Sequence, residues 1–224
     1  MRAALFDMDG VLVDVSKSYL VAIQKTVGFY LNMPVGLREI QEYRNRGGLN
    51  NDWDLTECIL QEKGKDIAKQ AIIEVFQKFY LGENFDGLIK SEQWLLKRAV
   101  LEQILIHRKT GIVTGRPRME ASYVLRRFDF TDCFSVVITM EDVPPDKNKP
   151  DPFGLELALK SLSSESAYYF GDTVDDMMAA KKAGVTPVGI VAPGSDAVMQ
   201  KEVLLGHGAI QVLENINQLM EVLS

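Results

Sequence analysis

Short apolar runs and longer amphipathic stretches alternate along this 224-residue chain. Residues 3–6 are all apolar and are followed at once by acids, which is typical of a buried strand in a parallel sheet. Between about residues 16 and 80 the apolar positions instead recur every three or four residues, with breaks at 32–34, 47–48 and 63–64. This stretch predicts four short helices and no strand.

Beyond residue 87 the short apolar runs return, and each is followed by a helical pattern. The runs predict strands at residues 110–113, 136–139, 167–170, 187–191 and 209–212. Helices are predicted at residues 94–106, 119–128, 153–159, 174–183, 197–205 and 216–223. Such alternation favours an α/β fold with a parallel sheet covered by helices on both faces. An all-α fold fits less well, because several of the runs are only four or five residues long.

The change of pattern also divides the chain into domains. We expect an α/β core at residues 1–14 and 87–224, with a small α-helical cap at residues 15–86 inserted after the first strand. Gly82 and Gly87 mark a candidate hinge between the two. Apolar residues make up 46% of the chain and charged residues 25%, which argues against a disordered protein.

Charge and cysteine content exclude several classes of protein. The chain has 25 basic and 31 acidic residues and a net charge of −6, so we expect no nucleic-acid partner. No apolar run approaches the roughly 18 residues of a membrane span, so we expect no membrane partner either. Cys58 and Cys133 lie far apart, which disfavours a disulfide framework or a zinc–thiolate site, and Asp7 interrupts any apolar leader. These features favour a cytoplasmic protein.

Chemically active side chains follow the predicted strands at the points where those strands end. They form four groups: Asp7 with Asp9, Thr114 with Gly115, Lys149 with Pro150, and Gly171-Asp172 with Asp175 and Asp176. Each group alone has an ordinary explanation, such as a solvated turn, a strand end or the acidic first turn of a helix. All four in chain order are harder to explain in that way, because α/β folds bind ligands at the carboxyl ends of their strands.

The four groups resemble the motifs of the haloacid dehalogenase-like hydrolases. The matching runs are Asp7-Met8-Asp9-Gly10-Val11, Thr114-Gly115, Lys149-Pro150 and Gly171-Asp172-Thr173-Val174-Asp175-Asp176. The resemblance covers essentially the whole chain. The helical insertion resembles the small C1-type cap of phosphoglycolate phosphatases and β-phosphoglucomutases. A Rossmann-like core, phosphoryl transfer and a small phosphorylated metabolite as substrate are what this resemblance implies.

The resemblance also implies catalytic roles. Asp7 would be the nucleophile that forms an aspartyl-phosphate, and Asp9 would protonate the leaving alcohol and then take a proton from water. Lys149 and Thr114 would hold the phosphoryl oxygens. The backbone N–H groups of Gly115 and of the Met8 region would complete this cradle.

A phosphate monoester carries about two negative charges at neutral pH, so a carboxylate cannot attack it unless that charge is screened. The resemblance therefore implies Mg²⁺, held by the carboxylates of Asp7 and Asp172 and by the backbone carbonyl of Asp9. Asp176 either joins this metal site or steadies it, and Asp175 could share that role.

Three further residues are candidates for substrate binding. Arg46 and Asn50 lie in a cap segment rich in Arg, Gly and Asn, and arginine suits a carboxylate or a second phosphate. The same segment could instead be a helix end followed by a helix that Asn51 or Asp52 caps. Arg116 could contact phosphate, reach toward the cap or form an exposed ion pair.

Three functions remain open at this point. A phosphatase is favoured. A phosphomutase of the β-phosphoglucomutase type can have identical motifs. A non-enzymatic phospho-accepting domain fits less well, because in such domains the Asp that accepts the phosphoryl group lies on a later strand. Dehalogenation is disfavoured by Asp9, because a halide leaving group needs no proton. The substrate, and whether the protein is a monomer or a homodimer, are left open.

Overall fold

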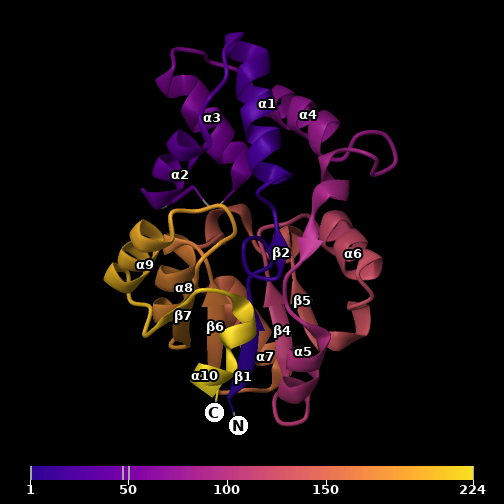
Figure 1. The fold of residues 1–224 in the computed structure, drawn as a ribbon, viewed down its shortest axis with the longest axis vertical. Helices are drawn as coiled ribbons and strands as arrows, with labels where there is room; N and C mark the ends of the chain where they lie inside the picture. The colour runs from indigo at the N-terminus through magenta and orange to yellow at the C-terminus, as the bar shows by residue number, and fades with distance from the viewer. Residues whose placement is uncertain (1, 47, 50, 224) are drawn as a thin grey trace. The chain divides into compact units, whose positions relative to one another are not determined.

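The computed structural model describes residues 2–46, 48–49 and 51–223 (Figure 1). The chain forms two compact units, one made of Met1–Val13 with Trp94–Ser224 and the other of Asp14–Gln93. The first unit is an α/β domain and the second is helical, so the fold class expected from the sequence is confirmed.

Six parallel strands form the sheet of the first unit, in the order β5-β4-β1-β6-β7-β8. They are β1 (Ala3–Phe6), β4 (Thr110–Val113), β5 (Val136–Ile138), β6 (Ala167–Gly171), β7 (Thr186–Ile190) and β8 (Val212–Leu213). β1 is central and pairs with β4 on one side and β6 on the other. The strand order therefore changes direction beside β1, which is where open α/β sheets bind their ligands.

Helices of the first unit lie between these strands in the chain. They are α5 (Arg98–Leu105), α6 (Arg118–Arg127), α7 (Phe153–Leu162), α8 (Val174–Lys182), α9 (Ala197–Gly206) and the short α10 (Met220–Leu223). α7 packs against β4 and β5, and α8 packs against β6 and β7. The predicted strands and helices of this unit are present, with corrections at three places.

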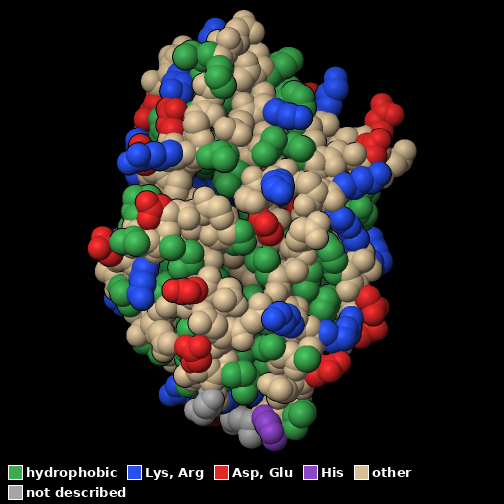
Figure 2. Space-filling model, in the orientation of Figure 1, with side chains coloured by type: hydrophobic (Ala, Val, Ile, Leu, Met, Phe, Trp, Pro, Cys, Tyr) green, Lys and Arg blue, Asp and Glu red, His purple; other side chains and the backbone are tan. Residues whose placement is uncertain are grey.

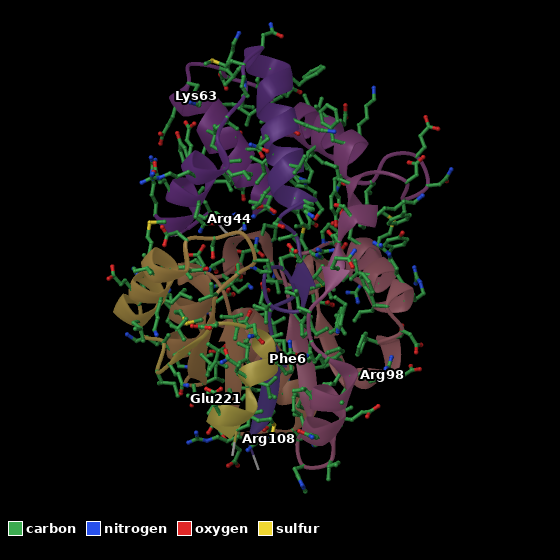
Figure 3. The ribbon with its side chains drawn as sticks, in the orientation of Figure 1. Phe6, Arg44, Lys63, Arg98, Arg108 and Glu221 are labelled. Carbon is green, nitrogen blue, oxygen red and sulfur yellow. The ribbon has the colours of Figure 1, made fainter. Side chains whose placement is uncertain are left out.

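Both faces of β1 are covered by side chains, because successive residues of a strand point to opposite faces. Leu5 belongs to a buried cluster with Val113 and Tyr169. Phe6, labelled in Figure 3, lies on the opposite face. Its ring stacks on Phe170 with centroids 5.2 Å apart and meets the edge of Phe134 at 6.0 Å. This two-sided burial explains why residues 3–6 are apolar without interruption.

The first correction concerns the predicted helix at residues 94–106. Helix α5 begins only at Arg98, and Gln93–Trp94 instead form strand β3, which pairs with β2 (Val13–Asp14). The Trp94 ring stacks on Phe130 at 4.3 Å and its indole N–H donates to the carbonyl of Leu96. Trp94 is therefore half-buried against Phe130 in a strand, and it does not belong to a helix.

The other two corrections lie near the C-terminus. The strand predicted at residues 209–212 covers only Val212–Leu213, at the edge of the sheet beside β7. The helix predicted at residues 216–223 is divided into a single 3₁₀ turn, Ile216–Gln218, and α10. Asn215 caps the 3₁₀ turn by accepting the N–H of Asn217, which sets the chain direction locally.

The second unit contains the four predicted helices, α1 (Tyr19–Leu31), α2 (Leu37–Asn45), α3 (Asp52–Glu62) and α4 (Lys69–Tyr80), followed by a 3₁₀ turn, Leu88–Ser91. α1 packs against α3 and α4, and Tyr19 stacks on Tyr80 at 4.2 Å. The buried stripe of α4 is Ile72, Phe76 and Tyr80, one residue later than the apolar repeat at positions 67, 71, 75 and 79 that predicts the helix. Asn51 caps α3 by accepting the N–H groups of Trp53 and Asp54.

Figure 2 shows acidic and basic side chains interspersed on the visible face of the molecule. Within the described ranges, no helix combines the length and the apolar content that crossing a bilayer requires.

Candidate active site

A turn follows β1 immediately, and it carries the first pair of acids. Asp7 extends the pairing of β1 with β6, because its N–H donates to the carbonyl of Phe170 at 2.8 Å. The carbonyl of Met8 then accepts the N–H groups of Leu12 and Val13, both at 2.9 Å. Met8 is fully buried, so its side chain belongs to the core of the turn.

Gly10 lets this turn lie against the end of β6. Its φ is +76°, in the left-handed region that glycine adopts without strain. A Cβ at this position would overlap the Oδ2 atom of Asp172. The glycine therefore brings the turn that carries Asp7 and Asp9 close to Asp172.

The fourth motif is held by the start of helix α8. The backbone N–H and the hydroxyl of Thr173 donate to Asp176 Oδ2 at 3.0 and 2.7 Å, and the N–H of Asp176 donates back to Thr173 Oγ1 at 3.2 Å. This capping box fixes the carboxylate of Asp176 as part of the helix start. Gln200 holds the neighbouring acid by donating to the carbonyl of Asp172 at 2.7 Å.

Lys149 connects the first and fourth motifs. Its Nζ donates to Asp7 Oδ1 at 2.8 Å, to Asp176 Oδ1 at 2.6 Å and to the hydroxyl of Tyr169 at 3.0 Å. Burial alone would lower the pKa of Lys149. The nearby carboxylates of Asp176 and Asp7 together raise that pKa by more than burial lowers it, so it lies well above its usual value. Burial raises the pKa of Asp7 to about 7, against the opposing effect of Lys149.

Asp7, Asp172 and Asp176 form a buried group in which one carboxylate oxygen from each lies within 4.8 Å of the others. Lys149 supplies one positive charge against these three carboxylates. The donors are all hard oxygen atoms, the type that Mg²⁺ prefers over softer metals, and a divalent ion would balance the excess negative charge. The group therefore fits a metal ion. Asp175 is also buried but does not belong to it.

Thr114 and Gly115 follow β4 in the loop that leads to α6. The N–H of Thr114 donates to the carbonyl of Ile138 at 2.9 Å, which continues the pairing with β5. Its Oγ1 accepts the N–H of Arg116 at 3.2 Å, a bond that leaves the hydroxyl hydrogen for another acceptor. Gly115 is half-buried. Both residues lie at the carboxyl edge of the sheet, as do Asp7 and Asp172.

Asp9 and Arg116 form an ion pair. The Nε and Nη2 atoms of Arg116 both lie 2.5 Å from Asp9 Oδ1, and the arginine side chain is fully buried while that of Asp9 is 25% exposed. Of the options that the sequence leaves open for Arg116, the structure thus shows the ion pair, but the arginine is buried and not exposed as expected. The expected contact of the Asp9 carbonyl with a metal stays a prediction.

Tyr169 is a site residue that the sequence motifs do not reveal. Its hydroxyl lies 3.0 Å from Lys149 Nζ, 3.1 Å from Asp176 Oδ1 and 3.1 Å from the carbonyl of Val113. Burial raises its pKa well above the usual value, so the phenol stays neutral. Tyr169 pairs in register with Leu5, so it lies on the same face as Asp7. The hydroxyls of β6 are a signal in the sequence, but the strand holds two adjacent tyrosines, Tyr168 and Tyr169, and only the register with β1 separates them.

The two cap residues remain predictions. Asn50 lies outside the described residues. Arg46 belongs to the helical unit, where its guanidinium lies 4.1 Å above the ring of Tyr43 and its Nη1 contacts Glu62 Oε1 at 2.8 Å. The Arg46 side chain is about half exposed, so it keeps access to solvent.

Comparison with known proteins identifies the class to which this fold and site belong. Residues 4–190 match the family described as "Haloacid dehalogenase-like hydrolase", and the chain belongs to that family. It is 36% identical over 202 residues to an imidazoleglycerol-phosphate dehydratase of Phytophthora nicotianae. The aligned region covers 86% of this chain but only 44% of that protein. It therefore spans less than half of that relative's length.

Two further matches cover nearly whole chains. The chain is 28% identical over 207 residues to the phosphoglycolate phosphatase of Escherichia coli K12, covering 85% of this chain and 81% of the relative. Its fold is similar to that of a hydrolase from Pseudomonas syringae, with a TM-score of 0.79, 23% identity and coverage of 100% and 98%. The chain is a C1-capped member of the family and a phosphatase, which confirms the enzyme class expected from the sequence.

Proposed function

We propose that the protein is a Mg²⁺-dependent phosphomonoesterase that hydrolyses a small phosphorylated metabolite through an aspartyl-phosphate on Asp7. The observation that carries this proposal is the contact of Lys149 with both Asp7 and Asp176 inside the buried group of acids. Attack on a dianionic ester requires a carboxylate nucleophile with a cation beside it, and the two further acids give a divalent ion a place to bind and screen the remaining negative charge.

The substrate phosphoryl group would be held by residues from two loops. The hydroxyl of Thr114 and the N–H of Gly115 donate to its oxygens, and Lys149 supplies a positive charge. Mg²⁺ bound by Asp7, Asp172 and Asp176 would neutralise charge on the phosphoryl group when present. With the charge screened, a carboxylate oxygen of Asp7 forms a bond to phosphorus while the bond to the leaving oxygen breaks.

Asp9 moves the protons in both halves of the reaction. It gives a proton to the leaving alcohol oxygen in the first half, and the alcohol departs. In the second half it takes a proton from water, whose oxygen attacks the phosphorus of the aspartyl-phosphate. Inorganic phosphate leaves, and both Asp7 and the protonated Asp9 are regenerated.

The nucleophile is tested by Asp7→Asn, assayed by phosphate release from p-nitrophenyl phosphate and from a panel of phosphorylated metabolites with Mg²⁺. We expect turnover to fall by at least about 10³-fold, because removal of a nucleophile leaves only binding and charge stabilisation. Asp132→Asn, at an exposed acid of the same unit, is the matched control and should retain full activity. Near-normal turnover in Asp7→Asn would refute the assignment.

A phosphomutase would share these residues and would differ in what receives the phosphoryl group. If the wild type isomerises a sugar phosphate and releases little free phosphate, the phosphomutase is the correct function. Phosphate release without isomerisation supports the phosphatase.

A further inference from the structure

Arg116 is the largest fully buried side chain among the described residues. Burial of a guanidinium carries a large desolvation free energy, which a paired carboxylate offsets. It contacts Asp9, whose Oδ1 lies 2.5 Å from both Nε and Nη2 of the arginine. The cation is therefore placed on the acid to which the proposed function assigns both proton transfers.

The arginine backbone is fixed to the sheet edge on both sides. Its N–H donates to Thr114 Oγ1 at 3.2 Å, and its carbonyl accepts the N–H of Met140 at 3.0 Å. The side chain thus reaches Asp9 from an anchored point in the loop between β4 and α6. Both partners belong to the α/β unit, so the contact forms within one compact body.

We propose that Arg116 is a positioning residue for Asp9. It holds the carboxylate by Oδ1 and so presents Oδ2 for the exchange of a proton with the leaving oxygen and then with water. A guanidinium stays protonated in proteins, so Arg116 acts through Asp9 and supplies no proton itself. This inference rests on the proposed function, and it differs from the earlier expectation that Arg116 contacts the substrate.

A comparison of substrates with different leaving groups distinguishes a positioning role of Arg116 from general damage to the active site. An alkoxide leaves poorly without a proton, whereas p-nitrophenolate is stable enough to leave without one. Loss of Arg116 should therefore slow the hydrolysis of an alkyl phosphate and spare p-nitrophenyl phosphate. The ratio kcat/KM is the right quantity, because it reports the steps up to phosphoryl transfer to Asp7 and excludes the later hydrolysis.

The experiment compares Arg116→Met, Asp9→Asn and the double variant with the wild type. The substrates are p-nitrophenyl phosphate and the alkyl phosphate that the wild type hydrolyses fastest. We expect Arg116→Met to lower kcat/KM for the alkyl phosphate by about 10²-fold, the low end of general acid catalysis, and for p-nitrophenyl phosphate by less than about 3-fold. The double variant should be no slower than Asp9→Asn alone, because both changes remove the same function. Arg126→Met, at an exposed arginine of α6, is the matched control.

Three results would overturn the inference. The first is an equal loss of kcat/KM on both substrates in Arg116→Met. The second is a double variant whose loss of kcat/KM is the product of the two single losses. The third is a rise in KM for the alkyl phosphate at unchanged kcat, which would make Arg116 a substrate-binding residue. If thermal unfolding shows that Arg116→Met does not fold, Arg116→Lys is used in the same comparison, since it keeps the charge and loses the paired contact. A wild type that releases no phosphate from either ester would instead refute the proposed function.

Discussion

At the scale of single residues, Lys149 shows how the site is organised. An ammonium group has three N–H donors, and those of Lys149 are directed to Asp7, Asp176 and Tyr169. A phosphoryl oxygen that approaches Lys149 must share or replace one of these acceptors. Tyr169 is the neutral one and therefore the weakest. The hydroxyl of Tyr169 thus holds Lys149 in place while leaving it able to bind the substrate.

Tyr169→Phe tests this role of the hydroxyl. We expect kcat to fall by about 10-fold, because Lys149 and Asp176 lose a shared partner that orients them. The free energy of unfolding should decrease by only about 1 kcal/mol, the usual contribution of one hydrogen bond. Tyr168→Phe is the matched control, since that neighbouring hydroxyl accepts from Arg2 at an exposed position. Steady-state kinetics showing kcat of Tyr169→Phe within about 2-fold of wild type would contradict this role.

At the scale of elements, the start of α8 combines a structural and a chemical task. Thr173 and Asp176 satisfy the first N–H groups of the helix through their capping box. The same bonds hold Asp176 Oδ2, which leaves Oδ1 directed at Lys149 and Tyr169. The helix cannot begin elsewhere without displacing this acid from the group that it forms with Asp7 and Asp172.

Thr173→Ala removes the hydroxyl from this capping box. We expect the free energy of unfolding, measured in urea, to fall by about 1 kcal/mol, the usual value of an N-cap. We also expect the Mg²⁺ concentration for half-maximal activity to rise by about 10-fold, because Asp176 loses the hydroxyl that orients it. Thr173→Ser keeps the hydroxyl and should restore both quantities. A loss of stability with an unchanged Mg²⁺ requirement would show that the cap does not serve the metal site.

At the scale of the whole molecule, the parts predictable from the sequence are those set by local patterns. The run at β1 is apolar because both its faces are buried, and the motif acids follow strands directly, so both are visible in a short window. The place of Tyr169 depends on its register with Leu5, and the contact of Arg116 with Asp9 joins residues 107 positions apart. Pairing over such distances is set by the packing of the sheet and its loops, which no local pattern encodes.

The balance of charge at the site makes a final prediction about metal and pH together. Without a metal, burial raises the pKa of Asp7 from 3.8 to about 7, so the folded protein binds more protons at this group than the unfolded chain between those values. Asp7 therefore reduces the stability of the metal-free protein as pH rises from about 4 to about 7. A divalent ion reverses this effect, because it favours the ionised carboxylates of Asp7, Asp172 and Asp176.

We therefore expect Mg²⁺ to raise Tm, and to raise it more at pH 8 than at pH 5, where the ion competes with protons for Asp7. At 100 times its dissociation constant the ion would contribute about 2.7 kcal/mol, or a shift of about 5–11 °C for a chain of this size. EDTA should abolish the shift, and Asp172→Asn should show little response to Mg²⁺, whereas Asp132→Asn should respond like the wild type. Thermal unfolding followed by circular dichroism at both pH values measures each quantity. A Tm that is the same with millimolar Mg²⁺ and with EDTA at pH 8 would mean that the three acids hold no magnesium in the folded protein.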